Sequence, residues 1–338
     1  MCGRWSTAPE TATLSPIGGC IASKDRQRAR LNGIELASLP EDFRRVEHFK
    51  TYAPTANMVV VRTLFAYAAI EGLHIQQFDI KAAFLYGDLE ETVYMHQPAG
   101  FAKGDKVCLL KRSLYALKQA PRQWCRKFSE FLLETSLVIS SEDRCVFYKL
   151  DPFLALVIYV DDGILFARQP KDADELIDKL SKRFELHNMA LSTFLGFQVE
   201  RPHKHQIILH QKCYINKILT KFAQDDTKTE RSPISPKGMC EDETPLDSSI
   251  PYRNTIGSLL YASLTTRIDI AFPVALASRY LSAPTNKILF LVNRITRYLR
   301  GEHDRGISYQ PSKNEGLIAY CDSDFANDEE GRLSLIHI

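Results

Sequence analysis

Two adjacent carboxylates, Asp161 and Asp162, follow directly on the apolar run LALVIYV. The runs on either side, 153–160 and 163–167, are rich in β-formers, and the two-residue polar break between them predicts a β-hairpin with the aspartates at its tip. Adjacent carboxylates repel each other unless a cation lies between them, and oxygen ligands at a rigid turn suit Mg²⁺. On this segment alone, the alternative of an ordinary hairpin turn, in which the aspartates serve only as turn formers, has equal weight.

A third carboxylate, Asp79, ends the short strand predicted for HIQQFDI, after an apolar helix over 59–70 and Gly72. Two metal ions about 3.5–4 Å apart need shared ligands, so a two-metal site predicts Asp79 close to Asp161 and Asp162. The alternative role of Asp79 is to cap the turn that follows it.

A basic segment supplies a counter-charge for phosphate. Residues 101–130 hold only two acids, Asp105 and Glu130, against eight bases: Lys103, Lys106, Lys111, Arg112, Lys118, Arg122, Arg126 and Lys127. Apolar spacing predicts a helix over 121–134, whose free N–H groups beside Arg122 could bind an anion. Tyr115 and Trp124 could stack on bases, although Trp124 is expected in the core. A solvated basic face is the alternative.

Composition limits the remaining classes. With 338 residues, 45% hydrophobic content and a net charge of +2, the chain is globular, and any nucleic-acid surface must be local. Even the apolar run that contains 154–160 is far shorter than the roughly 20 residues that span a membrane, and the start carries no signal-peptide pattern. Dinucleotide, P-loop, hydrolase-elbow and zincin motifs are missing from the sequence. We therefore expect an intracellular protein that is neither secreted nor membrane-bound.

The second half of the chain is predicted to be mainly helical. An acidic, proline-containing stretch at 225–250 reads as an exposed loop or linker, and Pro273 is expected to break or kink a helix. The further predicted elements are an amphipathic helix in 172–184, a hairpin in 194–211, helices in 252–266, 271–281 and 286–299, and strands in 306–310 and 316–325.

Several of these segments occur together in one known family. The blocks are TYAPTANMVVVRTLFAYAAIEGLHIQQFDIKAAFLYGDLEETVYMHQPAGF, VCLLKRSLYALKQAPRQW, YVDDGILFA, STFLGFQVER, YRNTIGSLLYASLTTRIDIA and RYLRG. In this order they resemble the reverse transcriptase of copia-type retrotransposons, over roughly residues 50–332. The resemblance implies an α+β right-hand polymerase of fingers, palm and thumb, with an antiparallel palm sheet that carries the YVDD hairpin.

The resemblance also implies site residues. Asp79, Asp161 and Asp162 match the family's metal-binding catalytic carboxylates, for two Mg²⁺ ions with Mn²⁺ as a substitute. Phe84 matches the aromatic residue that screens the sugar 2′-hydroxyl, and Gln119 matches a glutamine that contacts the incoming nucleotide. Arg122 is assigned to the nucleotide as well. The residues expected on nucleic acid are Lys111, Arg112, Lys118, Arg126 and Lys127. The implied partners are an RNA template, a DNA primer and deoxynucleotides.

The expected organisation has four parts: a poorly ordered lead-in at 1–50, fingers and palm at 51–205, thumb or connection helices at 206–310, and the start of a ribonuclease H-like domain at 311–338. Asp322 matches the first catalytic aspartate of that last domain, which is expected to be truncated. A cytoplasmic virus-like particle or the nucleus is the expected location. A catalytically inactive remnant that only binds nucleic acid is the alternative function, and the sequence leaves the oligomeric state open.

Overall fold

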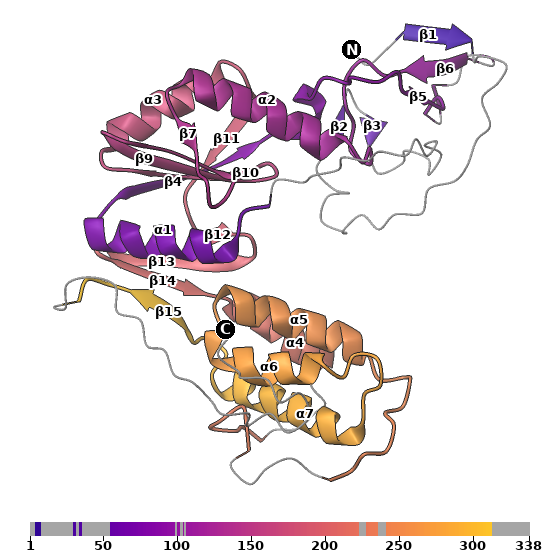
Figure 1. The fold of residues 1–338 in the computed structure, drawn as a ribbon, viewed down its shortest axis with the longest axis vertical. Coiled ribbons are helices and arrows are strands. Elements are labelled where there is room, and N and C mark those ends of the chain that lie inside the picture. The colour runs from indigo at the N-terminus through magenta and orange to yellow at the C-terminus, as the bar shows by residue number, and fades with distance from the viewer. Residues whose placement is uncertain are drawn as a thin grey trace.

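The computed structural model describes residues 4–7, 30–31, 34–35, 55–98, 100–101, 104, 106–222, 228–235 and 241–312. Figure 1 shows a layered α/β part and a helical part. Apart from three two- to four-residue strands, the predicted lead-in lies outside the described residues, as do the strand at 316–325 and Asp322. Among the described residues, no helix is long and apolar enough to cross a membrane.

The layered part is built on a six-stranded sheet in the order β11-β4-β10-β9-β8-β7, in which every pair of neighbours is antiparallel. The strands are β4 (His74–Ile80), β7 (Val138–Ile139), β8 (Val146–Leu150), β9 (Phe153–Tyr159), β10 (Asp162–Ala167) and β11 (Leu186–Met189). β9 and the end of β10, from Ile164 to Ala167, are apolar on both faces because helices cover both sides of the sheet (Figure 1). The predicted antiparallel sheet is confirmed.

Three helices cover this sheet, with α2 (Ala120–Glu134) and α3 (Pro170–Ser181) on one face and α1 (Met58–Glu71) on the other (Figure 1). The Asn57 side chain caps α1 by accepting from the Val59 N–H, and Gly72 ends it at a φ of 62°, which favours glycine. Apolar residues at helical spacing in α2 face the core, as predicted. All three helices begin and end within a few residues of their predicted bounds.

A second, four-stranded antiparallel sheet lies beyond α1, in the order β12-β13-β14-β15. Its strands are β12 (Thr193–Phe194), β13 (Phe197–His203), β14 (Gln206–His210) and β15 (Gly306–Tyr309). The Phe65 ring of α1 contacts Phe166 of the first sheet at 5.4 Å and Phe197 of the second at 6.0 Å, centroid to centroid. One apolar core therefore joins α1 to both sheets, and the predicted 194–211 hairpin is confirmed.

Short elements extend the layered part beyond the sheet's edge. β1 (Arg4–Thr7) pairs with β6 (Lys106–Leu109), which pairs in turn with β5 (Tyr94–Met95), and β2 (Arg30–Leu31) pairs with β3 (Ile34–Glu35). The 3₁₀ helix η3 (Ala83–Tyr86) connects β4 to this region.

The helical part has a core of its own. It consists of α4 (Lys212–Phe222), α5 (Tyr252–Thr265), the 3₁₀ helix η4 (Ile268–Ile270), α6 (Ala271–Ser278) and α7 (Asn286–Gly301). The predicted break at Pro273 is wrong. Pro273 lies in the first turn of α6, where a helix needs no backbone N–H from it, so the proline fits the helix.

The described residues of the acidic stretch form a mostly exposed loop, as predicted, and this loop is anchored to α7. The Asp242 carboxylate accepts a hydrogen bond from the Asn286 side chain at 3.0 Å, and Lys287 pairs with Glu243 at 2.6 Å. Arg294 pairs with Glu230 at 3.0 Å. These contacts hold the described residues of the stretch along the helix.

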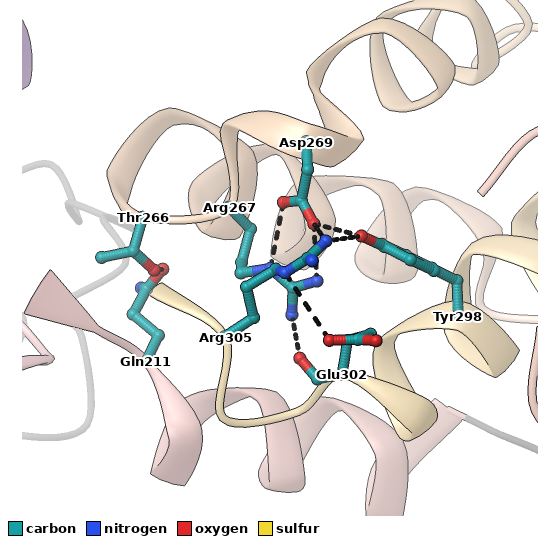
Figure 2. Close-up of polar contacts among 7 residues, drawn as sticks. All are labelled: Gln211, Thr266, Arg267, Asp269, Tyr298, Glu302 and Arg305. Atoms are coloured by element: carbon teal, nitrogen blue, oxygen red, sulfur yellow. Dashed lines mark hydrogen bonds and ion pairs between the residues drawn. The ribbon is translucent and has the colours of Figure 1, made fainter. Parts of the chain in front are cut away.

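A buried polar network ties the end of α5 to the end of α7 (Figure 2). The fully buried Arg267 guanidinium donates to both carboxylate oxygens of Asp269, at 3.0 and 2.8 Å, and to the Glu302 backbone carbonyl at 2.7 Å. The Tyr298 hydroxyl donates to Asp269 at 2.6 Å and accepts from Arg305 at 2.9 Å. A buried charge is tolerated only when it is paired and hydrogen-bonded, and here Asp269 compensates Arg267.

The same network sets the ionisation of Asp269. Burial acts to raise the pKa of this carboxyl, but hydrogen bonds from Arg267 and Tyr298 and the charges of Arg267 and Arg305 outweigh burial, and the pKa lies below its usual value. Because the folded-state pKa is lowered, the carboxylate stabilises the fold above the unfolded-state pKa of about 4, and this contribution is lost as the pH falls through the folded-state value.

We expect Asp269→Asn to destabilise the helical part by about 3 kcal/mol at pH 7, since the buried Arg267 loses its counter-charge. Urea unfolding followed by circular dichroism at pH 7 and pH 3 measures this loss. The difference between variant and wild type should shrink at pH 3. Asp304→Asn, at an exposed aspartate nearby, is the control and should match wild type at pH 7. Equal stability of Asp269→Asn and wild type at pH 7 would contradict the role given to the pair.

Candidate active site

The hydrogen-bonded register of β4 and β10 places Asp79 directly opposite Asp162. Residues directly opposite each other on antiparallel strands point to the same face of the sheet, with their Cβ atoms about 4.5–5.5 Å apart. The Ile80 backbone N–H donates to the Asp161 carbonyl at 2.9 Å, so the turn is bonded to the same end of β4. The predicted proximity of Asp79 to Asp161 and Asp162 is confirmed.

The turn itself is displaced by one residue from its predicted position. Tyr159 pairs with Asp162, so the two loop residues are Val160 and Asp161, and Asp162 is the first residue of β10. The prediction that both aspartates lie in the break was therefore wrong, because β9 ends at Tyr159, one residue before the apolar run ends, and β10 begins at Asp162. Only Asp161 lies in the turn, while Asp162 is held by strand pairing on both sides.

The backbone of the turn is strained at Val160, whose φ is 62°. A β-branched residue rarely adopts a positive φ, because its side chain crowds the backbone there. The indole N–H of Trp124 donates to the Val160 carbonyl at 2.6 Å. Trp124 is fully buried, so it belongs to the core as expected, and the alternative of base stacking does not hold. Its hydrogen bond ties the turn to α2.

Just after the turn, the ring of Phe78 lies close to the backbone of Gly163. This glycine pairs with Phe78 of β4, and a Cβ atom at Gly163 would lie 2.2 Å from the Phe78 ring. The ring therefore packs over the glycine, one residue from both Asp79 and Asp162. Glycine is needed here for space, and the buried ring fixes the distance between the two strands.

A polar row crosses the sheet at this level: His187 of β11, Asp79, Asp162 and Tyr159 are successive partners on neighbouring strands. His187 carries no signal in the sequence, because a single histidine in the strand LHNM belongs to no motif. Within the part of the chain that the structure describes, no group of three or more His, Cys, Asp or Glu side chains is arranged to hold a metal ion. The two hard oxygen ligands in this row, Asp79 and Asp162, are direct partners on neighbouring strands.

Phe84 and Gln119 lie on neighbouring elements, η3 and the start of α2. The Phe84 ring is half-buried and packs on Tyr115, with 4.6 Å between ring centroids. The Ser113 hydroxyl donates to the Phe84 carbonyl, which fixes the backbone of η3. Gln119 is the residue before α2 and is only 7% exposed. The fold thus places Phe84 in an aromatic pair and Gln119 in a buried position.

The predicted basic surface is partly neutralised by acids. Lys127 and Arg112 pair with Asp88 at 2.7 and 3.7 Å, and the hydrogen bond from Lys127 is the main cause that lowers the pKa of Asp88. Arg126 pairs with Glu130 at 2.9 Å and with Glu90.

The other residues assigned to nucleic acid or nucleotide are Lys111 and Lys118, which are exposed, and Arg122, which lies in the first turn of α2. Lys103 lies outside the described residues. For Arg112, Arg126 and Lys127 the ion pairs support the alternative of a solvated charged face.

Comparison with known proteins identifies the family of the chain. The sequence model of the reverse transcriptase (RNA-dependent DNA polymerase) family matches residues 28–236. The chain is 34% identical to the retrovirus-related Pol polyprotein from transposon TNT 1-94 of Nicotiana tabacum, over 95% of this chain and 25% of that protein. It is 30% identical to the corresponding polyprotein from transposon RE1 of Arabidopsis thaliana, over 98% of this chain and 23% of that protein.

A more distant relative is the transposon Ty1-H Gag-Pol polyprotein of Saccharomyces cerevisiae, 22% identical over 83% of this chain and 17% of that protein. The chain thus spans about a quarter or less of the length of these relatives. The matched region contains the whole β4, β9 and β10 arrangement with its three aspartates. The chain therefore belongs to the reverse transcriptase (RNA-dependent DNA polymerase) family, in the branch of copia-type retrotransposon Pol polyproteins.

Proposed function

We propose that this chain catalyses RNA-directed DNA synthesis, in which the primer 3′-hydroxyl attacks the α-phosphate of a deoxynucleotide paired with an RNA template. The observation that carries the proposal is the alignment of Asp79 with Asp162 across two paired strands, with Asp161 in the adjoining turn. Membership of the reverse transcriptase family supports the substrate class.

The chemistry of these carboxylates suits divalent metal ions. Carboxylate oxygens are the ligands that Mg²⁺ prefers, and Mg²⁺ binds proteins through one or two carboxylates together with substrate phosphates and water. Asp79, Asp161 and Asp162 would hold two Mg²⁺ ions, with Mn²⁺ as a substitute. When bound, such ions stabilise the charge on the attacking and leaving oxygens of the phosphoryl group. The chain's own contribution is to hold these three carboxylates at one end of a rigid sheet.

We propose that the six-stranded sheet with α2 and α3 forms the palm of a right-hand polymerase and that helices α4–α7 form the thumb or connection. The separate cores of the layered and helical parts support this division. The boundary near residue 205 falls in the β13–β14 hairpin, so the second sheet belongs in part to each side.

In this proposal Phe84 packs under the sugar of the incoming nucleotide, and its ring excludes a 2′-hydroxyl by van der Waals overlap. Its aromatic contact with Tyr115 and the hydrogen bond from Ser113 to its carbonyl support a fixed ring position. Gln119, at the start of α2, would contact the same nucleotide. Among the basic residues, Lys111 and Lys118 are the better candidates for the nucleic-acid backbone because they are exposed.

Replacing Asp161 by Asn should lower primer extension on an RNA template with Mg²⁺ by about a thousandfold, because a neutral amide binds a divalent ion poorly. Template binding should stay within a few-fold of wild type, since phosphate contacts come mainly from lysine and arginine. A gel extension assay and fluorescence anisotropy measure the two effects. Asp174→Asn, at an exposed position of α3, is the matched control. A wild type that binds template without extending the primer would favour the inactive alternative, and full activity of Asp161→Asn would contradict the assigned role.

Replacing Phe84 by Ala should admit ribonucleotides, because the ring that overlaps the 2′-hydroxyl is gone. Because the ring is half-buried, we expect the variant to lose about 3 kcal/mol of stability. Competition between deoxynucleotides and ribonucleotides in the extension assay measures sugar selection. Phe131→Ala is the matched control, because Phe131 is half-buried against the same core. It should lose similar stability and keep its selection. Unchanged selection in a folded Phe84→Ala protein would remove Phe84 from the nucleotide site.

A further inference from the structure

Tyr261 of helix α5 contacts the turn between β12 and β13, and thereby joins the helical part to the second sheet. The Tyr261 hydroxyl donates to the Leu195 carbonyl in this turn. Leu195 and Gly196 are the two turn residues, and both have a positive φ, of 47° and 84°. A Cβ atom at Gly196 would lie 3.2 Å from the same hydroxyl, so glycine leaves room for the tyrosine here.

The β12–β13 turn lies on the aspartate side of the six-stranded sheet. Gln77 and Asp79 are two residues apart on β4, so their side chains point to the same face. The buried Gln77 side chain donates from Nε2 to the Thr193 carbonyl of β12, at 3.0 Å. β12 is thus bonded to the face that carries Asp79, and the turn begins two residues further along the chain.

The Tyr261 hydroxyl is also close to the polar row that contains the aspartates. Burial raises the pKa of this hydroxyl, and a hydrogen bond with Thr265 acts in the opposite direction. The nearby hydroxyls of Tyr214 and Tyr159 raise the pKa further. Tyr159 is the strand partner of Asp162. Because the pKa lies above its ordinary value, the Tyr261 hydroxyl keeps its proton at neutral pH and remains a donor.

Other contacts fix the ring of Tyr261 and the end of α5. The ring packs edge-on against Tyr214 of α4, with 5.0 Å between the ring centroids. The Tyr214 hydroxyl donates within the helical part, to the Ser258 carbonyl at 3.3 Å. The Arg62 guanidinium of α1 donates to the Leu264 carbonyl near the end of α5, at 3.0 Å. The helical part therefore holds the ring of Tyr261, while the hydroxyl is bonded to the turn.

We infer that Tyr261 is a positioning residue for the candidate active site: its hydroxyl fixes the β12–β13 turn on the aspartate side of the sheet and, with the turn, the placement of α5. Gln77 holds β12 from β4 and Tyr261 holds the turn from α5. The strand that carries Asp79 is thus joined to the helical part through β12. The inference rests on the proposed function, because it assigns Tyr261 to the positioning of that same site.

The test compares Tyr261→Phe with Tyr214→Phe, each of which removes one hydroxyl and keeps the aromatic ring. The first readout is hydrogen–deuterium exchange of the whole chain, followed in a peptide that spans 192–199. We expect Tyr261→Phe to speed exchange in this peptide about fivefold, as for the loss of one hydrogen bond. Tyr214→Phe should leave the exchange unchanged, because the Tyr214 hydroxyl donates inside the helical part.

The second readout is primer extension on an RNA template with Mg²⁺, with kcat and the KM for the deoxynucleotide measured separately. A small displacement of reacting groups lowers the rate of the chemical step. Tyr261→Phe should therefore lower kcat about tenfold and change KM less than about twofold. Tyr214→Phe should match wild type in both quantities.

Faster exchange in the turn together with a lower kcat in Tyr261→Phe would support the inference. Exchange equal to that of wild type, faster exchange with an unchanged kcat, or the same changes in Tyr214→Phe would overturn it. If the wild type does not extend a primer, the proposed function fails, and the exchange readout alone then decides whether Tyr261 fixes the turn.

Discussion

The antiparallel register between β4 and β10 is the constraint on which the candidate active site depends. It pairs Asp162 with Asp79 and Gly163 with Phe78, and a slip of one residue would move every side chain of one strand to the other face. The two carboxylates come from positions far apart in the sequence and repel each other, so other contacts must bring them together. The apolar burial of β9 and β10 stabilises the register and supplies the free energy that holds like charges side by side.

Helix α2 contacts both the turn between β9 and β10 and the 3₁₀ helix η3. One face of the helix packs in the core, and from it the Trp124 N–H donates to the carbonyl of Val160 in the strained turn. The start of the helix lies beside η3, which carries Phe84. A single helix thus holds the turn that carries Asp161 and lies beside the proposed nucleotide site, because its rotation is set by Trp124 and the other buried residues of its core face.

Much of this arrangement was predictable from the sequence, for identifiable physical reasons. The helix at 121–134 has clear periodicity, and the strand HIQQFDI followed from the helix end at Gly72 and the β-formers after it. The approach of Asp79 to Asp161 followed from the chemistry of a shared metal site. The position of the turn was not predictable, because Val160 adopts a positive φ that only tertiary contacts impose. The ion pairs of Arg126 and Lys127 were hidden as well, since Glu90 and Asp88 lie outside the basic segment. The role of Phe84 came from family resemblance, and no spacing rule would have found it.

The central claim is that Asp79, Asp161 and Asp162 form one metal-binding site at the end of the sheet. Anomalous X-ray diffraction from crystals of the chain grown with Mn²⁺ and a primer–template tests it most directly, because manganese scatters anomalously and also binds carboxylate oxygens. The account predicts anomalous peaks within coordination distance, about 2.0–2.3 Å, of oxygens of Asp79 and of the Asp161–Asp162 pair. Manganese bound elsewhere, with these carboxylates free of metal at saturating concentration, would contradict the account.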